Sequence, residues 1–292
     1  MNVLSLFDGM SCGRIALDRA GIEVGQYYAS EVDKYAMKVA QANWPDNIPL
    51  GDATKWRDWG IDWASIDLVT GGFPCQAWSM AGKQMGDKDE RGMLFWVMLD
   101  IMKHVRAHNK KAHFLIENVK MKKEFEEYIT LHTENALGRV YKALINSALV
   151  SAQNRNRYYW TSFKVEQPED KGVFLKNILE GDLSSDWDHT PKAIEYMSRS
   201  GSTGRVKWSY MFHSEESKGK SQCVTSNYFK GVPNNVLVCE GGLVRKFTPV
   251  ECERLQTIPD NYTNHASNTQ RYKMIGNGWT VDVVSHILRG LK

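Results

Sequence analysis

Strand-like and helix-like patterns alternate through residues 1–120, and this alternation constrains the fold more than any other feature of the sequence. Short apolar runs separated by stretches with apolar residues three and four apart predict strands separated by amphipathic helices. Such alternation favours an α/β fold, in which a mostly parallel sheet has helices on both faces. The predicted strands cover residues 2–7, 27–30, 66–70 and 112–116, and the predicted helices cover residues 14–20, 33–43 and 93–107.

Capping signals mark where several helices begin and end. Asp33 is a good N-cap for the second helix, and Gly21 can close the first helix at its C-terminus. Near the other end of the chain, residues 248–251 have the composition of a capping box, so a helix should begin there and stop near Pro259. Residues 276–278 predict a tight turn, and residues 281–291 can form a last helix.

Polar and glycine-rich segments follow four of the predicted strands. They are residues 9–13, Glu31, residues 71–76 and residues 117–118. In parallel sheets, ligands bind beyond the carboxyl ends of the strands. The sequence therefore predicts one binding site assembled from these four segments.

The alternating pattern ends after Phe163, and residues 196–231 have a different character. This window holds six basic and two acidic residues, so its local charge of +4 exceeds the net charge of +3 of the whole chain. Aromatic residues are interleaved with the basic ones, as in surfaces that bind nucleic acids. The alternative is a solvated, loop-rich small domain without such a function.

Composition excludes several other classes. No apolar run reaches the roughly 18 residues of a membrane span, and no basic residue precedes Arg14, which disfavours a membrane protein and a secretory leader. Five cysteines without short pairing disfavour a disulfide framework and favour a reducing cytoplasm. His104 and His108 have metal-ligand spacing on a predicted helix, but basic neighbours indicate helix-end charges. We expect no metal.

The first strand end has the features of a nucleoside site. Glycines between residues 9 and 13 allow a ligand to approach the backbone and the N-terminus of the following helix. Glu31 ends the next strand and could bind ribose hydroxyls, and Asp52 could bind an adenine amino group. The glycine spacing does not match the dinucleotide fingerprint, and glycines at such turns are often only structural.

The other strand ends carry candidate catalytic groups. Cys75 follows a strand end in a loop stiffened by Pro74, where a thiolate could act as a nucleophile, although a free cysteine is more often a buried apolar residue. Glu117 ends a different strand and could face the same cleft, or only form a turn. Residues 153–157 read as one extended segment with Gln153, Arg155 and Arg157 on one side. Such a face could equally be the exposed side of an edge strand.

Taken in order, these segments resemble the motifs of DNA (cytosine-5) methyltransferases, over nearly the whole chain outside residues 165–244. Val3–Glu31 and Gln153–Phe163 are most similar to the catalytic domain of the de novo type. Three departures stand out: Phe-Asp-Gly-Met-Ser-Cys-Gly replaces the commoner first motif, Phe73 stands where proline is common, and Trp279 replaces a smaller apolar residue. The matching segments are residues 7–13, Glu31, Asp52, residues 74–76, 117–119, 153–157, 248–256 and 276–281.

The resemblance implies a Rossmann-like S-adenosylmethionine-dependent methyltransferase fold with a small target-recognition domain. The catalytic and cofactor-binding domain would comprise residues 1–164 and 266–292, and the target-recognition domain residues 165–265. The activity implied is methyl transfer from S-adenosylmethionine to carbon 5 of a cytosine flipped out of duplex DNA. Cys75 would form the covalent adduct, Glu117 would bind ring nitrogen 3, and Arg155 and Arg157 would bind the base oxygen and orient the carboxylate.

The resemblance also implies the binding residues. Phe7 would stack on the adenine, and Pro74, Asn277 and Trp279 would line the methionine end of the cofactor. The basic window would hold the DNA, and the product would be S-adenosylhomocysteine. The cofactor-binding residues expected are Phe7, Asp8, Gly9, Met10, Gly13, Glu31, Val32, Asp52, Ala53, Pro74, Asn277 and Trp279. The DNA-binding residues expected are Gln76, Ser79, Arg199, Arg205, Lys207, Lys220 and Lys230.

Other functions stay open at this point. One small branch of this family methylates tRNA, although the long recognition segment favours DNA. A non-catalytic homologue would usually lack the cysteine or the glutamate, and this chain keeps both. A dinucleotide oxidoreductase would bind nicotinamide cofactors tightly. We expect a DNA partner, no membrane, and a cytoplasm, bacterial or of a phage-infected cell, where the protein associates with the nucleoid through DNA. A restriction enzyme partner is compatible with the sequence but not visible in it.

Overall fold

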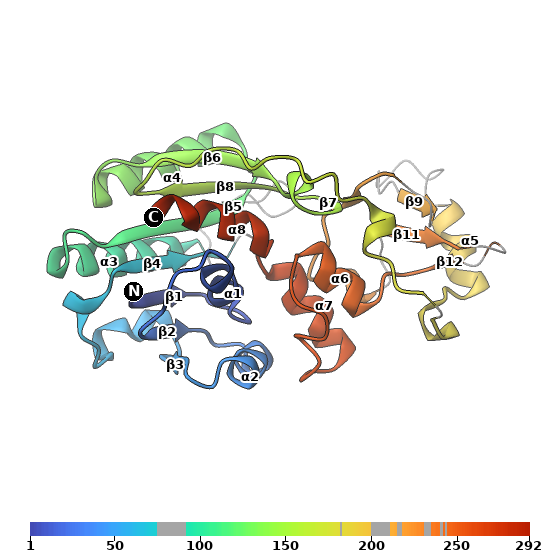
Figure 1. Ribbon diagram of the computed structural model, residues 1–292, viewed down its shortest axis with the longest axis horizontal. Helices are drawn as coiled ribbons and strands as arrows, with labels where there is room; N and C mark the ends of the chain where they lie inside the picture. Colours follow the sequence, from blue (N-terminus) through green and yellow to red (C-terminus); the bar gives the residue numbers. More distant parts are fainter. Residues whose placement is uncertain are drawn as a thin grey trace. The chain divides into compact units, whose positions relative to one another are not determined.

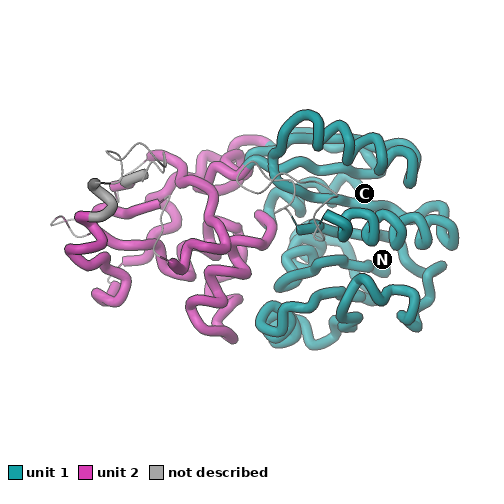
Figure 2. Tube along the Cα trace, turned by 180° about the vertical axis from the view of Figure 1, so that it is seen from behind, with its two compact units in different colours: residues 1–146, 156–168, 281–292 teal, residues 147–155, 169–280 magenta. Residues whose placement is uncertain are grey.

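The computed structural model describes residues 1–292 except 75–91, 182, 200–210, 215–217, 231–234, 240–241 and 243. Its residues form two compact units, drawn in teal and magenta in Figure 2. The first unit comprises Met1–Asn146, Asn156–Pro168 and Val281–Lys292, and the second comprises Ser147–Arg155 and Glu169–Thr280. Residues 266–280 thus lie with residues 169–265, which differs from the boundaries expected for the two functional domains. The functions expected of these domains remain predictions.

A seven-stranded sheet forms the centre of the first unit, in the order β3-β2-β1-β4-β5-β8-β6. Neighbouring strands from β3 to β5 are parallel, whereas β8 runs antiparallel to both β5 and β6. The predicted α/β class and mostly parallel sheet are confirmed. The strands are β1 (Val3–Leu6), β2 (Tyr27–Ser30), β3 (Ile48–Pro49), β4 (Leu68–Gly71), β5 (His113–Val119), β6 (Tyr141–Asn146) and β8 (Asn156–Thr161).

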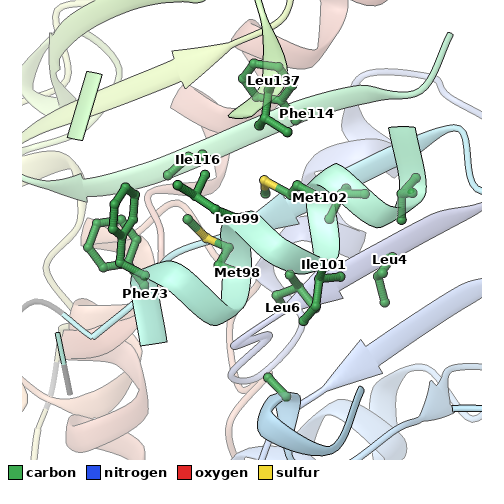
Figure 3. Packing of buried hydrophobic residues seen from close by; sticks show 14 of the residues in the cluster. Leu4, Leu6, Phe73, Met98, Leu99, Ile101, Met102, Phe114, Ile116 and Leu137 are labelled. Carbon is green, nitrogen blue, oxygen red and sulfur yellow. The ribbon is translucent and has the colours of Figure 1, made fainter. Parts of the chain in front are cut away.

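Helices cover the sheet of the first unit and bury both faces of its central strands. Leu4 and Leu6 of β1 pack into the cluster that also contains Phe114 and Ile116 of β5 and the apolar face of α3 (Figure 3). Val3, which alternation places on the opposite face, is also fully buried. Figure 1 shows α1 and α8 side by side, and these two helices contact each other. The helices are α1 (Cys12–Arg19), α2 (Lys34–Asn43), α3 (Met93–His108), α4 (Lys123–Leu137) and α8 (Val281–Leu288).

The second unit is built from small sheets and short helices. A three-stranded sheet has the order β12-β11-β9, and β10 pairs in parallel with β7. Its elements are β7 (Gln153–Asn154), α5 (Pro191–Arg199), β9 (Met211–Ser214), β10 (Ser221–Gln222), β11 (Asn235–Val238), β12 (Val244–Arg245), α6 (Pro249–Leu255) and α7 (Asn268–Asn277). The 3-10 helices of both units are Ala53–Asp58, Trp63–Ser65, Ser147–Leu149, Leu175–Asn177, Ser185–Trp187, Tyr228–Lys230 and Arg289–Leu291. Among the described helices, none is both long and apolar enough to span a membrane.

Most of the expected helix ends are confirmed. The Asp33 carboxylate accepts hydrogen bonds from the backbone N–H groups of Tyr35 and Ala36 at the start of α2. Gly21 adopts a positive φ of 66° after α1. The predicted capping box at the start of α6 is present, with Thr248 and Glu251 as its two members.

The predicted tight turn at residues 276–278 is wrong. Gly276 and Asn277 are the last residues of α7, and only Gly278 follows the helix. Gly276 is instead required by close packing, because a Cβ there would lie 2.2 Å from the carbonyl carbon of Thr225 and 2.3 Å from the backbone nitrogen of Ser226. The glycine lets two backbone segments of the second unit touch.

Removal of the α2 cap should weaken the fold modestly. Asp33→Ala should lower the free energy of unfolding by about 1 kcal/mol, because two N–H groups lose their acceptor. Asp33→Asn keeps a side-chain oxygen and should cost less. Urea denaturation of the two variants measures the difference, and an equal loss in both would contradict the capping role.

Candidate active site

The ends of four parallel strands meet at one edge of the first unit's sheet. Leu6 of β1 pairs with Ser30 of β2 and with Gly71 of β4, and Gly71 pairs with Ile116 of β5. The segments that follow β1, β2 and β4 therefore start from neighbouring positions, as the sequence predicted. Glu117 and Asn118 were expected to follow a strand but lie within β5, which continues to Val119. Cys75, Gln76 and Ser79 lie outside the described residues, so the structure reaches the catalytic loop only as far as Pro74.

The turn between β1 and α1 is held in an unusual backbone conformation. Phe7, Gly9 and Ser11 all have positive φ angles, of 55°, 62° and 64°. Asp8 stabilises this turn from inside, since its carboxylate accepts hydrogen bonds from Ser11 Oγ at 2.5 Å and Tyr27 Oη at 2.7 Å. Burial raises the pKa of Asp8 to about 6, although hydrogen bonds from Ser11 and Tyr27 oppose the shift. The Asp8 carboxylate is thus bound by side chains of the turn and of β2.

Glu31 fastens the ends of β1 and β2 together. Its Oε2 accepts a hydrogen bond from the Gly9 N–H at 2.8 Å, and its Oε1 accepts from the N–H groups of Val32 and Asp33. The side chain of Val32 beside it is left 70% exposed. An acceptor and an exposed apolar side chain thus lie next to each other at the strand end.

The remaining expected cofactor residues of the first unit differ in accessibility. Phe7 packs against the core and is only partly buried, whereas Met10, Gly13 and Ala53 are buried. Asp52 caps a 3-10 helix, where hydrogen bonds from the backbone N–H and hydroxyl of Thr54 lower its pKa.

Glu117 and Arg157 form an ion pair where β5 meets β8. The distance from Arg157 Nε to Glu117 Oε1 is 2.9 Å, and Glu117 is 8% exposed. Antiparallel pairing of Val119 with Arg157 brings the two side chains together. Next to Glu117, Asn118 Nδ2 donates a hydrogen bond to the Phe73 carbonyl at 3.0 Å. The Glu117–Arg157 ion pair therefore lies next to a hydrogen bond that ties β5 to the segment leading to Cys75.

The predicted extended segment from Gln153 to Arg157 is divided between two sheets. β7 pairs with β10 in the second unit, whereas β8 belongs to the seven-stranded sheet. Gln153 and Arg155 are buried in the second unit, which excludes the exposed side of an edge strand for them, and Arg157 belongs to the first unit. Arg155 donates hydrogen bonds to the carbonyls of Val224, Gly276 and Gly278. The chain crosses between the units here, which periodicity alone does not reveal.

The expected DNA-binding residues also separate into groups. Lys220 donates hydrogen bonds to the carbonyls of Ala148, Ser151 and Val173, and burial lowers its pKa. Lys230 is exposed, with Nζ 5.7 Å from the ring centroid of Phe229. Arg205 and Lys207, and the side chain of Arg199, lie outside the described residues.

Two residues with structural roles were not found by the sequence analysis. The Tyr27 hydroxyl donates to Asp8, and the only sequence signal for this contact was a tyrosine on the neighbouring predicted strand. Gln256 donates hydrogen bonds to the carbonyls of Ile275 and Gly278. Nothing in its local sequence places it beside a segment about 20 residues later.

Comparison with known proteins fits this arrangement of strand ends. The sequence profile of the C-5 cytosine-specific DNA methylases matches residues 1–292. The chain belongs to this family. It is 30% identical to the type II methyltransferase M.NlaX of Neisseria lactamica, over 99% of this chain and 96% of that protein. It is also 30% identical to the type II methyltransferase M.HhaI of Haemophilus parahaemolyticus, over 98% of this chain and 93% of that protein.

Solved structures show the same fold at lower sequence identity. A mutant DNMT2 of Spodoptera frugiperda matches with a TM-score of 0.73 at 19% identity, covering 99% of both chains. An E. coli prophage-encoded chain, described as a possible DNA modification methyltransferase, matches with a TM-score of 0.69 at 17% identity, covering 100% of this chain and 98% of that one. The predicted fold and family are confirmed, and the protein is a DNA cytosine-5 methyltransferase.

The raised pKa of Asp8 predicts a pH-dependent stability. Because the folded-state pKa exceeds its ordinary value of 3.8, the protonated acid favours folding, and this contribution is lost as the pH rises to about 6. Relative to the Asp8→Asn variant, the wild type should lose roughly 1–3 kcal/mol of unfolding free energy over this interval. Urea titrations of both proteins at several pH values test this, and parallel profiles would contradict it.

Proposed function

We propose that this enzyme methylates carbon 5 of a flipped cytosine in duplex DNA through a covalent bond between Cys75 and carbon 6. The observation that carries the proposal is the Glu117–Arg157 ion pair, joined through Asn118 to the loop that leads to Cys75. A nucleophile beside a carboxyl group with its own cation is what addition to a pyrimidine ring requires.

The chemistry assigns a separate task to each group. The Cys75 thiolate adds to carbon 6, and Glu117 shares a proton with ring nitrogen 3 as that atom gains electron density. Arg157 balances the carboxylate charge that remains when the proton moves towards the base. S-adenosylmethionine supplies the methyl group that carbon 5 attacks. Loss of the carbon 5 proton to a base then expels Cys75, and no described residue is assigned as that base.

The end of β2 supports S-adenosylmethionine as the donor. Each Glu31 oxygen has two lone pairs, and Oε2 accepts only the Gly9 bond among the described contacts, so it retains a site for a ribose hydroxyl. The exposed Val32 side chain offers an apolar surface for the adenine, and Phe7 is proposed to stack on it. We assign the adenine amino group to Asp52. By resemblance alone, Pro74, Asn277 and Trp279 are proposed for the methionine end.

The contacts divide the expected cofactor and DNA residues into those that shape the protein and those that can touch a ligand. Asp8, Met10 and Gly13 shape the β1–α1 turn, whereas Gly9 contacts Glu31 directly. Lys230 is proposed to contact DNA, because it is exposed, whereas the Lys220 ammonium is already bound by three carbonyls. Target recognition by residues 165–265, a restriction enzyme partner and a cytoplasmic location stay predictions.

The covalent step can be tested directly. Cys75→Ala should abolish tritium transfer from labelled S-adenosylmethionine to duplex DNA, and should also abolish cross-linking to an oligonucleotide that contains 5-fluorocytosine. Cys239→Ala removes a thiol from the second unit and should leave both reactions intact. Transfer by the Cys75→Ala variant at the wild-type rate would refute the proposal. A parallel assay on tRNA shows whether RNA is also a substrate.

The ion pair should control the rate of the same reaction. Glu117→Gln keeps the size of the side chain but removes the acid, and it should lower the turnover number by roughly a factor of 100 or more. Arg157→Lys should lower it less, because a charge remains near the carboxylate. Glu124→Gln, on the exposed face of α4, is the matched control. Single-turnover rates with saturating cofactor provide the measurement, and an unchanged rate in Glu117→Gln would rule out the acid role.

A further inference from the structure

We propose that Arg155 and Gln256 are positioning residues that hold residues 275–280 in the conformation that binds the cofactor. This inference rests on the proposed function, because it takes Asn277 and Trp279 as the residues that contact the methionine end. It gives Arg155 a different role from the base contact that its motif suggested. The described contacts that carry it all lie within the second unit.

Arg155 binds the C-terminal end of α7. Its Nη2 donates hydrogen bonds to the carbonyls of Gly276 at 3.2 Å and Gly278 at 2.8 Å. Carbonyls at the end of a helix have no partner within the helix, and a cation there is favoured by the helix dipole. The side chain is 3% exposed, so these carbonyls replace part of the hydration that its charge loses on burial.

Gln256 binds the same segment from α6. It is fully buried, and its Nε2 donates hydrogen bonds to the carbonyls of Ile275 at 2.8 Å and Gly278 at 3.0 Å. Its Oε1 accepts from Thr280 Oγ1 at 2.7 Å and from Gln153 Nε2 at 2.9 Å. Both donors and both acceptor sites of the amide are therefore used, and the Gly278 carbonyl is shared by the two positioning residues.

A backbone contact fixes the other side of the segment. Gly276 lies so close to Thr225 and Ser226 that no side chain fits there. Arg155 Nη1 also binds this neighbouring segment, through the Val224 carbonyl at 3.1 Å. Residues 275–278 thus lie against residues 224–226, and Arg155 binds both of these backbone segments.

Arg155 and Gln256 bind backbone carbonyls of this segment, and the side chains near its end stay at least partly exposed. Asn277 is exposed and Trp279 is partly exposed, whereas residues 274–276 are buried. Fixed backbone on both sides of an accessible side chain reduces the conformational entropy lost when a ligand binds. The arrangement therefore fits a preorganised ligand contact better than a catalytic role for Arg155.

Calorimetry with S-adenosylhomocysteine and the full chain, in the absence of DNA, tests the inference. Arg155→Lys loses a charge-assisted hydrogen bond to residues 276–278, and this should weaken binding of S-adenosylhomocysteine by about tenfold or more. Gln256→Glu removes two donors at constant size and should have a similar effect, which covers the case in which Arg155→Lys does not fold. Arg254→Lys is the matched control, since Arg254 binds the carbonyls of Ile178 and Leu179 and should bind the product within about twofold of wild type.

Kinetics separate positioning from contact with the base. A positioning role predicts a raised KM for S-adenosylmethionine with a turnover number at saturation within about threefold of wild type. If folded Arg155→Lys binds S-adenosylhomocysteine normally but fails to cross-link to 5-fluorocytosine, the inference is overturned and Arg155 contacts the base. If the wild type neither binds the product nor transfers methyl groups, the proposed function itself fails, and this inference fails with it.

Discussion

In-register pairing of parallel strands is the constraint on which the site depends. Pairing of Leu6 with both Ser30 and Gly71, and of Gly71 with Ile116, brings the ends of four strands to one edge. A shift of one residue would turn every side chain of a strand to the other face, and both faces are buried here. The buried rows of Leu4, Leu6, Phe114 and Ile116 therefore fix the register that places Glu31 and Glu117 at the same edge.

The charged groups at this edge are fixed by specific partners. Glu31 binds three backbone N–H groups, and Glu117 binds Arg157. Asp8 accepts hydrogen bonds from the hydroxyls of Ser11 and Tyr27, and burial raises its pKa. A buried carboxylate is costly unless it is bonded in this way. These partners fix the orientation of Glu31 directly after β2 and of Glu117 within β5.

In the second unit, the same buried hydrogen bonds stabilise the fold and hold the segment proposed to bind the cofactor. Arg155 and Gln256 come from distant parts of the sequence and bind one short segment at the end of α7, and Gln153 binds Gln256. Their buried bonds stabilise the unit, and they also determine the backbone around Asn277 and Trp279. A residue that resembles a catalytic arginine in sequence is thus placed by its contacts in a supporting position.

The sequence by itself determined the α/β alternation, the caps at Asp33 and Thr248, and the position of Glu31 directly after a strand, because these follow from local periodicity and local hydrogen bonding. Only the tertiary structure decided that Arg155 and Arg157 belong to different units, that the Lys220 ammonium is bound internally, and that Gly276 lies within a helix. Each of these depends on a backbone group far away in the chain. Local pattern carries no information about such a partner, since many distant carbonyls could accept the same hydrogen bond.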